Sequence, residues 1–160
     1  MGLLAYDGDD KRFHVEHLWT DDMVLVVPRK HPLASHKRAT LEEIASCDLI
    51  VIEPFVPARQ RIADELALRG IALPPSTMVG MLSTVLGMLD AGMGVALMTR
   101  WLSNQVRNQP AGHVVLEIDG INLERKYCLL YSRSASLSTA AQSFCAFLRS
   151  ADPLTGSAPA

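Results

Sequence analysis

His14, Glu16 and His17 form the first pattern in the chain that is typical of chemistry, because all three side-chain types ligate metal ions. Apolar and polar residues alternate loosely around them, which indicates a strand. Strand residues three positions apart point to opposite faces. The two imidazoles therefore cannot share an ion, and we expect no metal site here.

Motifs of common enzyme classes are absent. The sequence contains no Gly-x-Ser-x-Gly, no glycine-rich phosphate loop with a lysine and no His-Glu-x-x-His. Cys47, Cys128 and Cys145 are odd in number and lie in apolar segments, which is typical of reduced, buried thiols rather than of disulfides, metal ligands or nucleophiles. We therefore predict neither catalysis nor a cofactor.

The pair Gly92-x-Gly94 resembles part of a dinucleotide-binding fingerprint, but its context excludes that function. The fingerprint requires a strand before it, a helix after it and a third glycine. Here residues 82–89 have the apolar spacing of a helix, and a buried strand follows at 95–98. Leu97 stands where the third glycine belongs. We predict that Gly92 ends the helix in a left-handed conformation.

The loop after the apolar run 49–53 is a better candidate for ligand binding. In open α/β sheets, small ligands lie beyond the carboxyl ends of strands, where helix N-termini present free N–H groups. This loop offers Phe55 as an aromatic wall, and the helix that follows carries Arg59. Together they suit a small organic anion. Alternatively, Phe55 only closes the edge of the core and Arg59 is solvated.

Strands and helices alternate along the chain, which predicts an α/β fold with a largely parallel sheet. Thr40 and Glu43 form a capping box, and Ser138 is placed to cap the last helix. The predicted strands are 2–6, 23–27, 49–53, 77–79, 95–98, 114–118 and 127–131. The predicted helices are 41–45, 57–69, 82–91, 100–106 and 139–148.

The composition is that of a globular protein. Of 160 residues, 49% are hydrophobic and 20% charged, which excludes a disordered chain. A formal charge of −2 gives these residues no electrostatic reason to bind nucleic acid or an anionic membrane. No apolar run reaches the ~20 residues of a membrane span. The N-terminus lacks the pattern of a secretory signal, so we expect a cytoplasmic protein.

Several segments, taken in order, resemble the effector-binding domain of LysR-type transcriptional regulators. Leu18-x-x-Asp-Asp-Met-Val-Leu-Val-Val-Pro28, followed by His-Pro-Leu-Ala at 31–34, is similar to the start of the second lobe of that domain. Helix 82–91 with the Gly92-x-Gly94 turn is similar to the family's "Val-x-x-Gly-x-Gly-Ile-Ala". Further matching segments are 41–44, 48–50, 59–64, 125–131 and 138–148. The resemblance covers residues 2–150.

This resemblance implies the two-lobed fold of type 2 periplasmic binding proteins, with a mixed, mainly parallel sheet. The second lobe would comprise residues 21–132 and be nearly complete. Residues 1–20 and 133–150 would be the remnant of a first lobe truncated at its N-terminus, and residues 151–160 a flexible tail. The family's winged helix-turn-helix would precede this sequence.

The resemblance also implies where a ligand would bind, namely in the cleft between the lobes. Family contacts from the second lobe correspond to the loop 53–55 and to the strand end at 98–99. Together with Arg59 from the loop analysis, the predicted ligand-binding residues are Glu53, Pro54, Phe55, Arg59, Met98 and Thr99.

The predicted function is effector sensing in a LysR-type bacterial transcriptional regulator. Its expected partners are a small organic effector, expected to be an anion, and further copies of the chain. DNA would be reached only through the missing helix-turn-helix, and no membrane is involved. The alternative is a solute-binding protein of a transport system, which shares the fold but requires export. An α/β enzyme is the third hypothesis, and the lack of catalytic groupings disfavours it.

Overall fold

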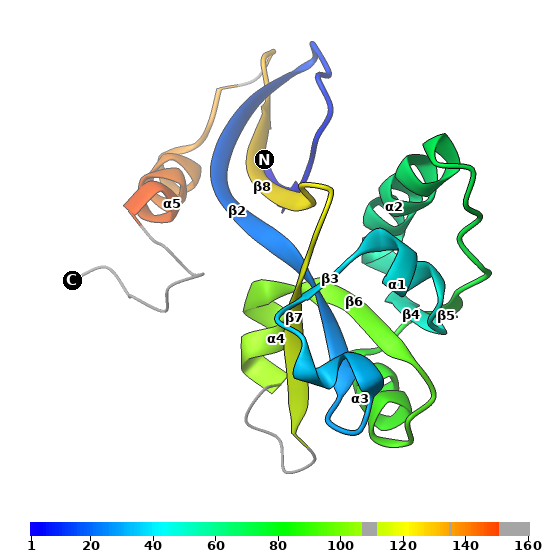
Figure 1. Cartoon of the computed structure of the whole chain (residues 1–160). Helices are drawn as coiled ribbons and strands as arrows, with labels where there is room; N and C mark the ends of the chain where they lie inside the picture. The colour runs from blue at the N-terminus through cyan, green and yellow to red at the C-terminus, as the bar shows by residue number, and fades with distance from the viewer. Residues whose placement is uncertain (107–111, 135, 151–160) are drawn as a thin grey trace. The chain divides into compact units, whose positions relative to one another are not determined.

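Strand β2 (Phe13–Pro28) is the element that two parts of the chain share. The structure, a computed structural model, describes residues 1–106, 112–134 and 136–150 (Figure 1). The chain divides into two compact units. Unit 1 comprises Met1–Asp21 and the chain from Glu124 onward, and unit 2 comprises Asp22–Leu123.

The sheet of unit 2 is mixed. β7 and β6 flank β2 as antiparallel partners, and β4 is parallel to both β6 and β5. A short β3 pairs in parallel with β7. The strand bounds are β3 Arg38–Ala39, β4 Leu49–Ile52, β5 Thr77–Val79, β6 Val95–Thr99 and β7 His113–Ile118. The predicted α/β fold with a mixed sheet is thereby confirmed.

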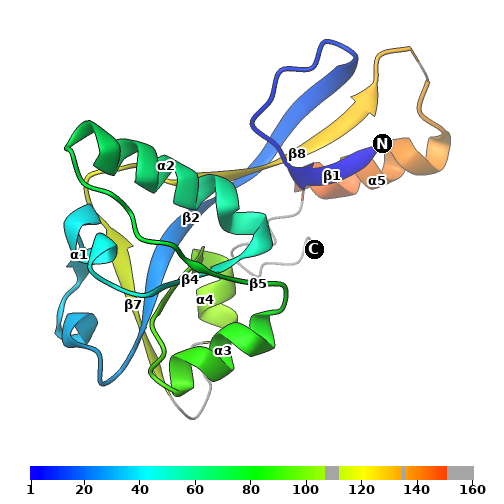
Figure 2. The same ribbon diagram turned by 90° about the vertical axis from the view of Figure 1, so that its right-hand side faces the viewer.

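Helices pack on this sheet because its central strands are apolar on both faces. Every residue of β4 and β6 is buried. α2 contacts β4 and α1, α3 contacts β4, β5 and β6, and α4 contacts β6 (Figure 2). The helix bounds are α1 Leu41–Ala45, α2 Val56–Leu68, α3 Leu82–Asp90 and α4 Arg100–Val106, with 3-10 helices η1 Pro32–Ser35 and η2 Glu53–Phe55.

Helix α3 and strand β6 confirm the periodicity read from the sequence. Val85, Leu86 and Leu89 are buried and form the apolar stripe of α3. The chain turns at Gly92, whose φ of 70° is the left-handed conformation expected after a helix. Burial of this stripe against β4, β5 and β6 is what holds α3 on the sheet.

The capping box that begins α1 is also confirmed. The Glu43 backbone N–H donates to Thr40 Oγ1 at 3.2 Å, and the Thr40 N–H donates to Glu43 Oε2 at 2.8 Å. Two orphan donors of the helix N-terminus are satisfied in this way. Helix α1 therefore begins where the capping box of Thr40 and Glu43 predicts.

Unit 1 contains strands β1 (Gly2–Ala5) and β8 (Glu124–Ser132), the first half of β2, and helix α5 (Thr139–Ser150). β1 pairs antiparallel with β8, which also neighbours β2. Cys145 and Leu148 of α5 pack with Leu129 in a small apolar cluster. The Ala141 N–H donates to Ser138 Oγ at 3.3 Å, so Ser138 caps α5 as predicted.

Three features differ from the expectations or lie beyond them. β2 is one continuous strand rather than a loose segment followed by the run 23–27. β1 exposes Leu3 and Leu4, so it is not the buried strand that its apolar run indicated. The tail 151–160 lies outside the described residues, and the assignment of the two units to family lobes stays a prediction.

Among the residues that the structure describes, the helices lack the length and apolar character that crossing a membrane requires.

Candidate functional site

The carboxyl ends of three parallel strands lie along one edge of the unit 2 sheet. Val51 of β4 lies opposite Met78 of β5 and Leu97 of β6. Continuing this register places Glu53 level with Gly80 on one side and with Thr99 on the other. This edge, which we call the carboxyl edge, is where open α/β sheets bind ligands.

Two helices begin at the carboxyl edge without a side-chain cap. α2 follows β4 through η2, and its N-cap residue, Phe55, makes no side-chain hydrogen bond to the first turn. α3 follows β5, and its N-cap, Met81, likewise has no capping hydrogen bond. Neither helix has an acidic residue in its first turn. In α2 the first N–H group, that of Val56, already donates to Glu53 O, and the second residue is Pro57, which has no N–H. The groups that favour an anion at this edge are therefore the first N–H groups of α3 and the positive end of its dipole.

A cavity of about 410 Å³ opens at the carboxyl edge. Glu53 and Val56 line it from the β4 side, and residues 78–80 line it from the β5 side. Val56 and Met78 keep 38% and 48% of their surface exposed, so the cavity has apolar side chains that a ligand can reach. The cavity therefore combines apolar walls with the N-terminus of α3, and the charged side chain among its lining residues is that of Glu53.

Of the six predicted site residues, only Glu53 lines this cavity. Phe55 is buried in the core of unit 2, as the alternative interpretation of this residue expects. Met98 is fully buried in the same core. Thr99 is 2% exposed, and its Oγ1 accepts a hydrogen bond from the Leu102 N–H at 3.4 Å, so it begins α4.

Arg59 is held by the loop that precedes β5. Its Nε donates to Ser76 Oγ at 2.7 Å and its Nη2 donates to Pro74 O at 3.0 Å. The guanidinium thus ties α2 to this loop. Pro54 is exposed in η2. A ligand-binding role for these residues stays a prediction.

The sequence analysis missed Val56, Met78, Val79 and Gly80 as lining residues. A signal for them was present, because the strand 77–79 was predicted and the carboxyl-end rule applies to every parallel strand. What the sequence did not show is that β5 lies directly beside β4. Adjacent strands bring their following loops together, and this pairing creates the cavity.

The histidines of β2 take part in separate contacts within unit 1. His14 stacks on Tyr131 with ring centroids 5.1 Å apart, and His17 Nε2 lies 2.8 Å from Thr20 Oγ1. In the described part of the chain, no three histidine, cysteine, aspartate or glutamate side chains are grouped to hold a metal ion.

A sequence profile described as "LysR substrate binding domain" matches residues 1–153, nearly the whole chain. The chain belongs to this LysR family. Its fold is accordingly that of LysR effector-binding domains, which are of the type 2 periplasmic-binding kind.

Relatives of this LysR-family domain are transcriptional regulators. The HTH-type transcriptional activator CmpR of Synechocystis sp. is 22% identical over 136 residues, which are 84% of this chain and 44% of that protein. The HTH-type transcriptional regulator CatR of Pseudomonas putida is 31% identical over 102 residues, which are 62% of this chain and 35% of that protein. The chain thus spans less than half the length of these relatives.

Solved structures of the LysR family show the same fold at low identity. The effector binding domain of QuiR in complex with shikimate superposes with a TM-score of 0.73, at 20% identity, over 91% of this chain and 68% of that one. The Synechocystis CcmR regulatory domain in complex with 2-PG gives a TM-score of 0.73, at 15% identity, over 92% and 70%.

Proposed function

We propose that this chain is the effector-sensing part of a LysR-type bacterial transcriptional regulator and that it binds a small organic anion at the carboxyl edge of unit 2. The observation that carries the ligand assignment is the cavity between β4 and β5, where exposed apolar side chains meet the uncapped N-terminus of α3. Helix N-termini stabilise an acid group, and apolar walls accept the carbon skeleton of the ligand.

Similar proteins support this function. CmpR and CatR are named as transcriptional regulators, and QuiR and CcmR were solved with shikimate and 2-PG, both small organic acids. These names favour a regulator over a solute-binding protein of a transport system. They also support a protein that senses a ligand and does not transform it.

The activity of the whole regulator is part of the same proposal. DNA would be bound by a winged helix-turn-helix outside these 160 residues, since their formal charge is −2. We further propose that the protein acts in the cytoplasm, where its DNA lies, and as a homodimer or a higher homo-oligomer. Neither a cofactor nor a membrane is needed for this activity.

The ligand site is tested by filling the cavity from Gly80. A Cβ atom at Gly80 meets no atom within 4 Å, and its φ is not positive, so Gly80→Leu adds a side chain to the cavity without backbone strain. The matched control is Gly87→Leu on the exposed face of α3, where a Cβ atom also meets nothing within 4 Å. Leucine in a helix is about 1 kcal/mol more favourable than glycine, so the control should fold well.

Both variants and the parent chain are screened by thermal shift against aromatic and aliphatic carboxylates, and each ligand found is titrated by calorimetry. We expect Gly80→Leu to weaken binding by about ten-fold or more, the equivalent of losing one good contact. Gly87→Leu should bind as the parent does. Equal affinity of the two variants for every ligand would contradict a site at the carboxyl edge.

A further inference from the structure

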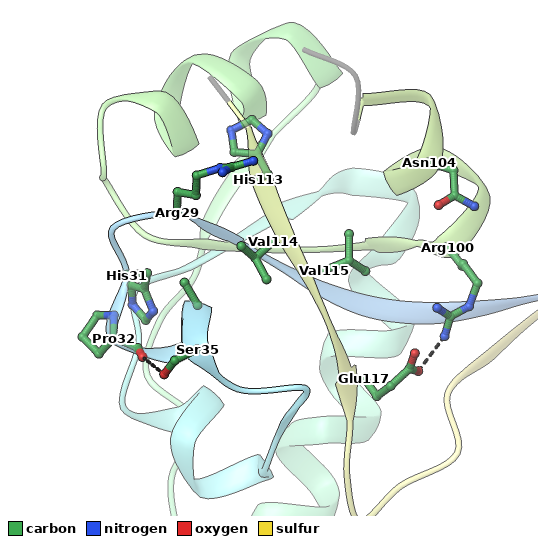
Figure 3. A pocket seen from close by; sticks show the side chains of 11 residues that line it. Arg29, His31, Pro32, Ser35, Arg100, Asn104, His113, Val114, Val115 and Glu117 are labelled. Carbon is green, nitrogen blue, oxygen red and sulfur yellow. Dashed lines mark hydrogen bonds and ion pairs between the residues drawn. The ribbon is translucent and has the colours of Figure 1, made fainter. Parts of the chain in front are cut away.

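A second polar hollow of about 870 Å³ lies between η1, β7 and α4 of unit 2, and we call it the β7 groove (Figure 3). None of its lining residues also lines the carboxyl-edge cavity. Arg29 and His113 lie at one end of the groove, and Arg100 and Glu117 lie at the other. The two ends differ in whether their arginine is paired.

Arg29 brings an unpaired positive charge to the first end. The other arginines of unit 2 that the structure describes each hydrogen-bond an oxygen atom of the protein, namely Arg38, Arg59, Arg61, Arg69 and Arg100. For Arg29 the described residues supply no such partner. An ideal Cβ on Gly112 would lie only 2.7 Å from Arg29 Nε, so the guanidinium rests against the bare backbone next to His113.

His113 adds an unsatisfied nitrogen at the same end. Its Nε2 lies 2.9 Å from Asp90 Oδ1, and its side chain is only 2% exposed. Within the described ranges, the buried Nδ1 atom has no hydrogen-bond partner. Buried polar atoms are normally paired, because leaving them unpaired costs free energy. A ligand hydroxyl can donate to this nitrogen, and a ligand oxygen can accept from it when it is protonated.

At the second end of the groove the arginine is already paired. Arg100 Nη2 donates to Glu117 Oε2 at 2.5 Å, and Arg100 Nε lies 3.6 Å from Asp22 Oδ2. Two carboxylates thus face one guanidinium. Of the two carboxylates, that of Glu117 lines the groove, where it can accept a hydroxyl donor. Asn104, which also lines the groove, offers an amide donor and an acceptor.

The edge of β7 adds backbone groups to the groove. The Glu117 N–H donates to Lys37 O at 3.1 Å and the Asp119 N–H donates to Ala39 O at 2.9 Å, so odd-numbered residues of β7 turn their backbone groups away from β2. The pairing of β3 with β7 begins at Glu117. The side to which backbone groups point alternates along a strand with period two. The N–H and C=O groups of Val115 therefore point to the same side as those of Glu117, and no described strand lies opposite Val115 there.

We propose that the β7 groove is a second ligand site of unit 2, which binds a small hydroxylated organic acid. The acid group lies at Arg29 and His113, and the hydroxyl groups point toward Asn104 and Glu117. Arg29 is unpaired among the described residues and favours an acid group at its end, whereas Arg100 at the other end is already paired with Glu117 and leaves room for hydroxyl groups. Carboxylates and phosphate monoesters share this chemistry, since a guanidinium binds both.

The test uses the ¹⁵N-labelled chain titrated with D-gluconate, a carboxylate, with glycerol 3-phosphate, a phosphate monoester, and with sorbitol, a neutral polyol. Amide shifts are followed at Val115 and Asn104 in the groove and at Gly80 and Leu82 at the carboxyl edge. The same titrations are made with Arg29→Gln and with the control Arg38→Gln, whose arginine is exposed and paired with Asp119.

We expect saturable shifts at Val115 and Asn104 with at least one of the two acids, and whichever acid binds identifies the acid group. Arg29→Gln should weaken that binding by about ten-fold or more, whereas Arg38→Gln should leave it unchanged. Shifts confined to Gly80 and Leu82 would overturn the proposal and leave the carboxyl-edge site standing. Equal binding of sorbitol, equal effects of the two variants, or no saturable shift at Val115 would also overturn it.

Discussion

At the scale of single residues, Gly94 is a position where no other residue fits. Its φ is 146°, and an ideal Cβ would lie 2.2 Å from the carbonyl oxygen of Asp48. That same oxygen accepts the Val95 N–H at 2.9 Å and so begins the pairing of β6 with β4. Gly94 therefore serves the close approach of two backbones, not the binding of a nucleotide.

We expect Gly94→Ala to lower the free energy of unfolding by about 3 kcal/mol or more, because backbone strain and a steric overlap add. Gly92→Ala is the matched control, with a φ of 70° but no atom within 4 Å of the Cβ. Its expected cost is about 1–2 kcal/mol, the strain of a left-handed residue. Urea unfolding measures both, and equal losses would contradict the role given to the Asp48 contact.

At the scale of elements, an ion pair joins α5 to β2 within unit 1. Arg149, in the last turn of α5, donates from Nε to Glu16 Oε1 at 2.6 Å and from Nη2 to Glu16 Oε2 at 2.7 Å. This pair lowers the pKa of Glu16 below its usual 4.5. A bidentate pair between two elements is stronger than a single contact, so it helps to hold the C-terminal helix on its sheet.

Because the pKa of Glu16 is lowered by folding, its contribution to stability is present above the unfolded pKa of about 4.5 and is lost as the pH falls through the folded value. We expect Glu16→Gln to unfold at a lower temperature than the parent near neutral pH. The difference should shrink at acidic pH as the parent loses the ion pair. Thermal melts over this pH range measure it.

Arg149→Gln in the Glu16→Gln background is the control for that measurement. Once the carboxylate is gone, the second substitution should add little, because both remove the same contact. A pH-independent difference between parent and Glu16→Gln would show that the ion pair does not stabilise unit 1.

At the scale of the whole molecule, unit 1 exposes several large apolar side chains. Leu3 and Leu4 of β1 are 43% and 42% exposed, and Phe144 and Phe147 of α5 are 46% and 51% exposed. Burying one such side chain is worth about 1.5–3 kcal/mol. Covering these residues in an assembly therefore favours association of copies of the chain.

We expect light scattering to give a mass that rises with protein concentration. The double substitution Phe144→Ser with Phe147→Ser should reduce this association. Leu68→Ser is the control, because Leu68 on α2 of unit 2 is 83% exposed but stands outside the apolar surface of unit 1. A monomer mass that is independent of concentration would refute self-association. If Leu68→Ser reduced association as much as the double substitution does, the apolar side chains of unit 1 would not be what drives it.

Much of the fold followed from local patterns in the sequence. Thr40 and Glu43 begin α1, the stripe of Val85, Leu86 and Leu89 forms α3, and Gly92 turns the chain. These features are local because capping, helical periodicity and a left-handed turn each depend on residues within a few positions. The family resemblance covered nearly the whole chain, and the profile match over residues 1–153 confirmed the family.

The candidate site was less predictable, since contacts between distant residues compete for its side chains. Arg59, expected to face a ligand, bonds to Pro74 and Ser76, which are 15 and 17 residues away. Phe55 lies in the core of unit 2, which is the alternative that the sequence analysis left open, and a ligand-binding role for it stays a prediction. Neither the hydrogen bonds of Arg59 nor the burial of Phe55 can be predicted from the sequence of the loop 53–57 alone.

By itself, the sequence determined the α/β class, the positions of most helices and strands, the family and the strand edge where ligands are expected. Only the tertiary structure decided that β5 lies beside β4, so that Met78 and Gly80 join Glu53 around a cavity. It also decided that Arg29 stands unpaired, among the described residues, beside the buried His113. Local propensity acts over a few residues, whereas a binding site is made by the pairing of strands that are far apart in the chain.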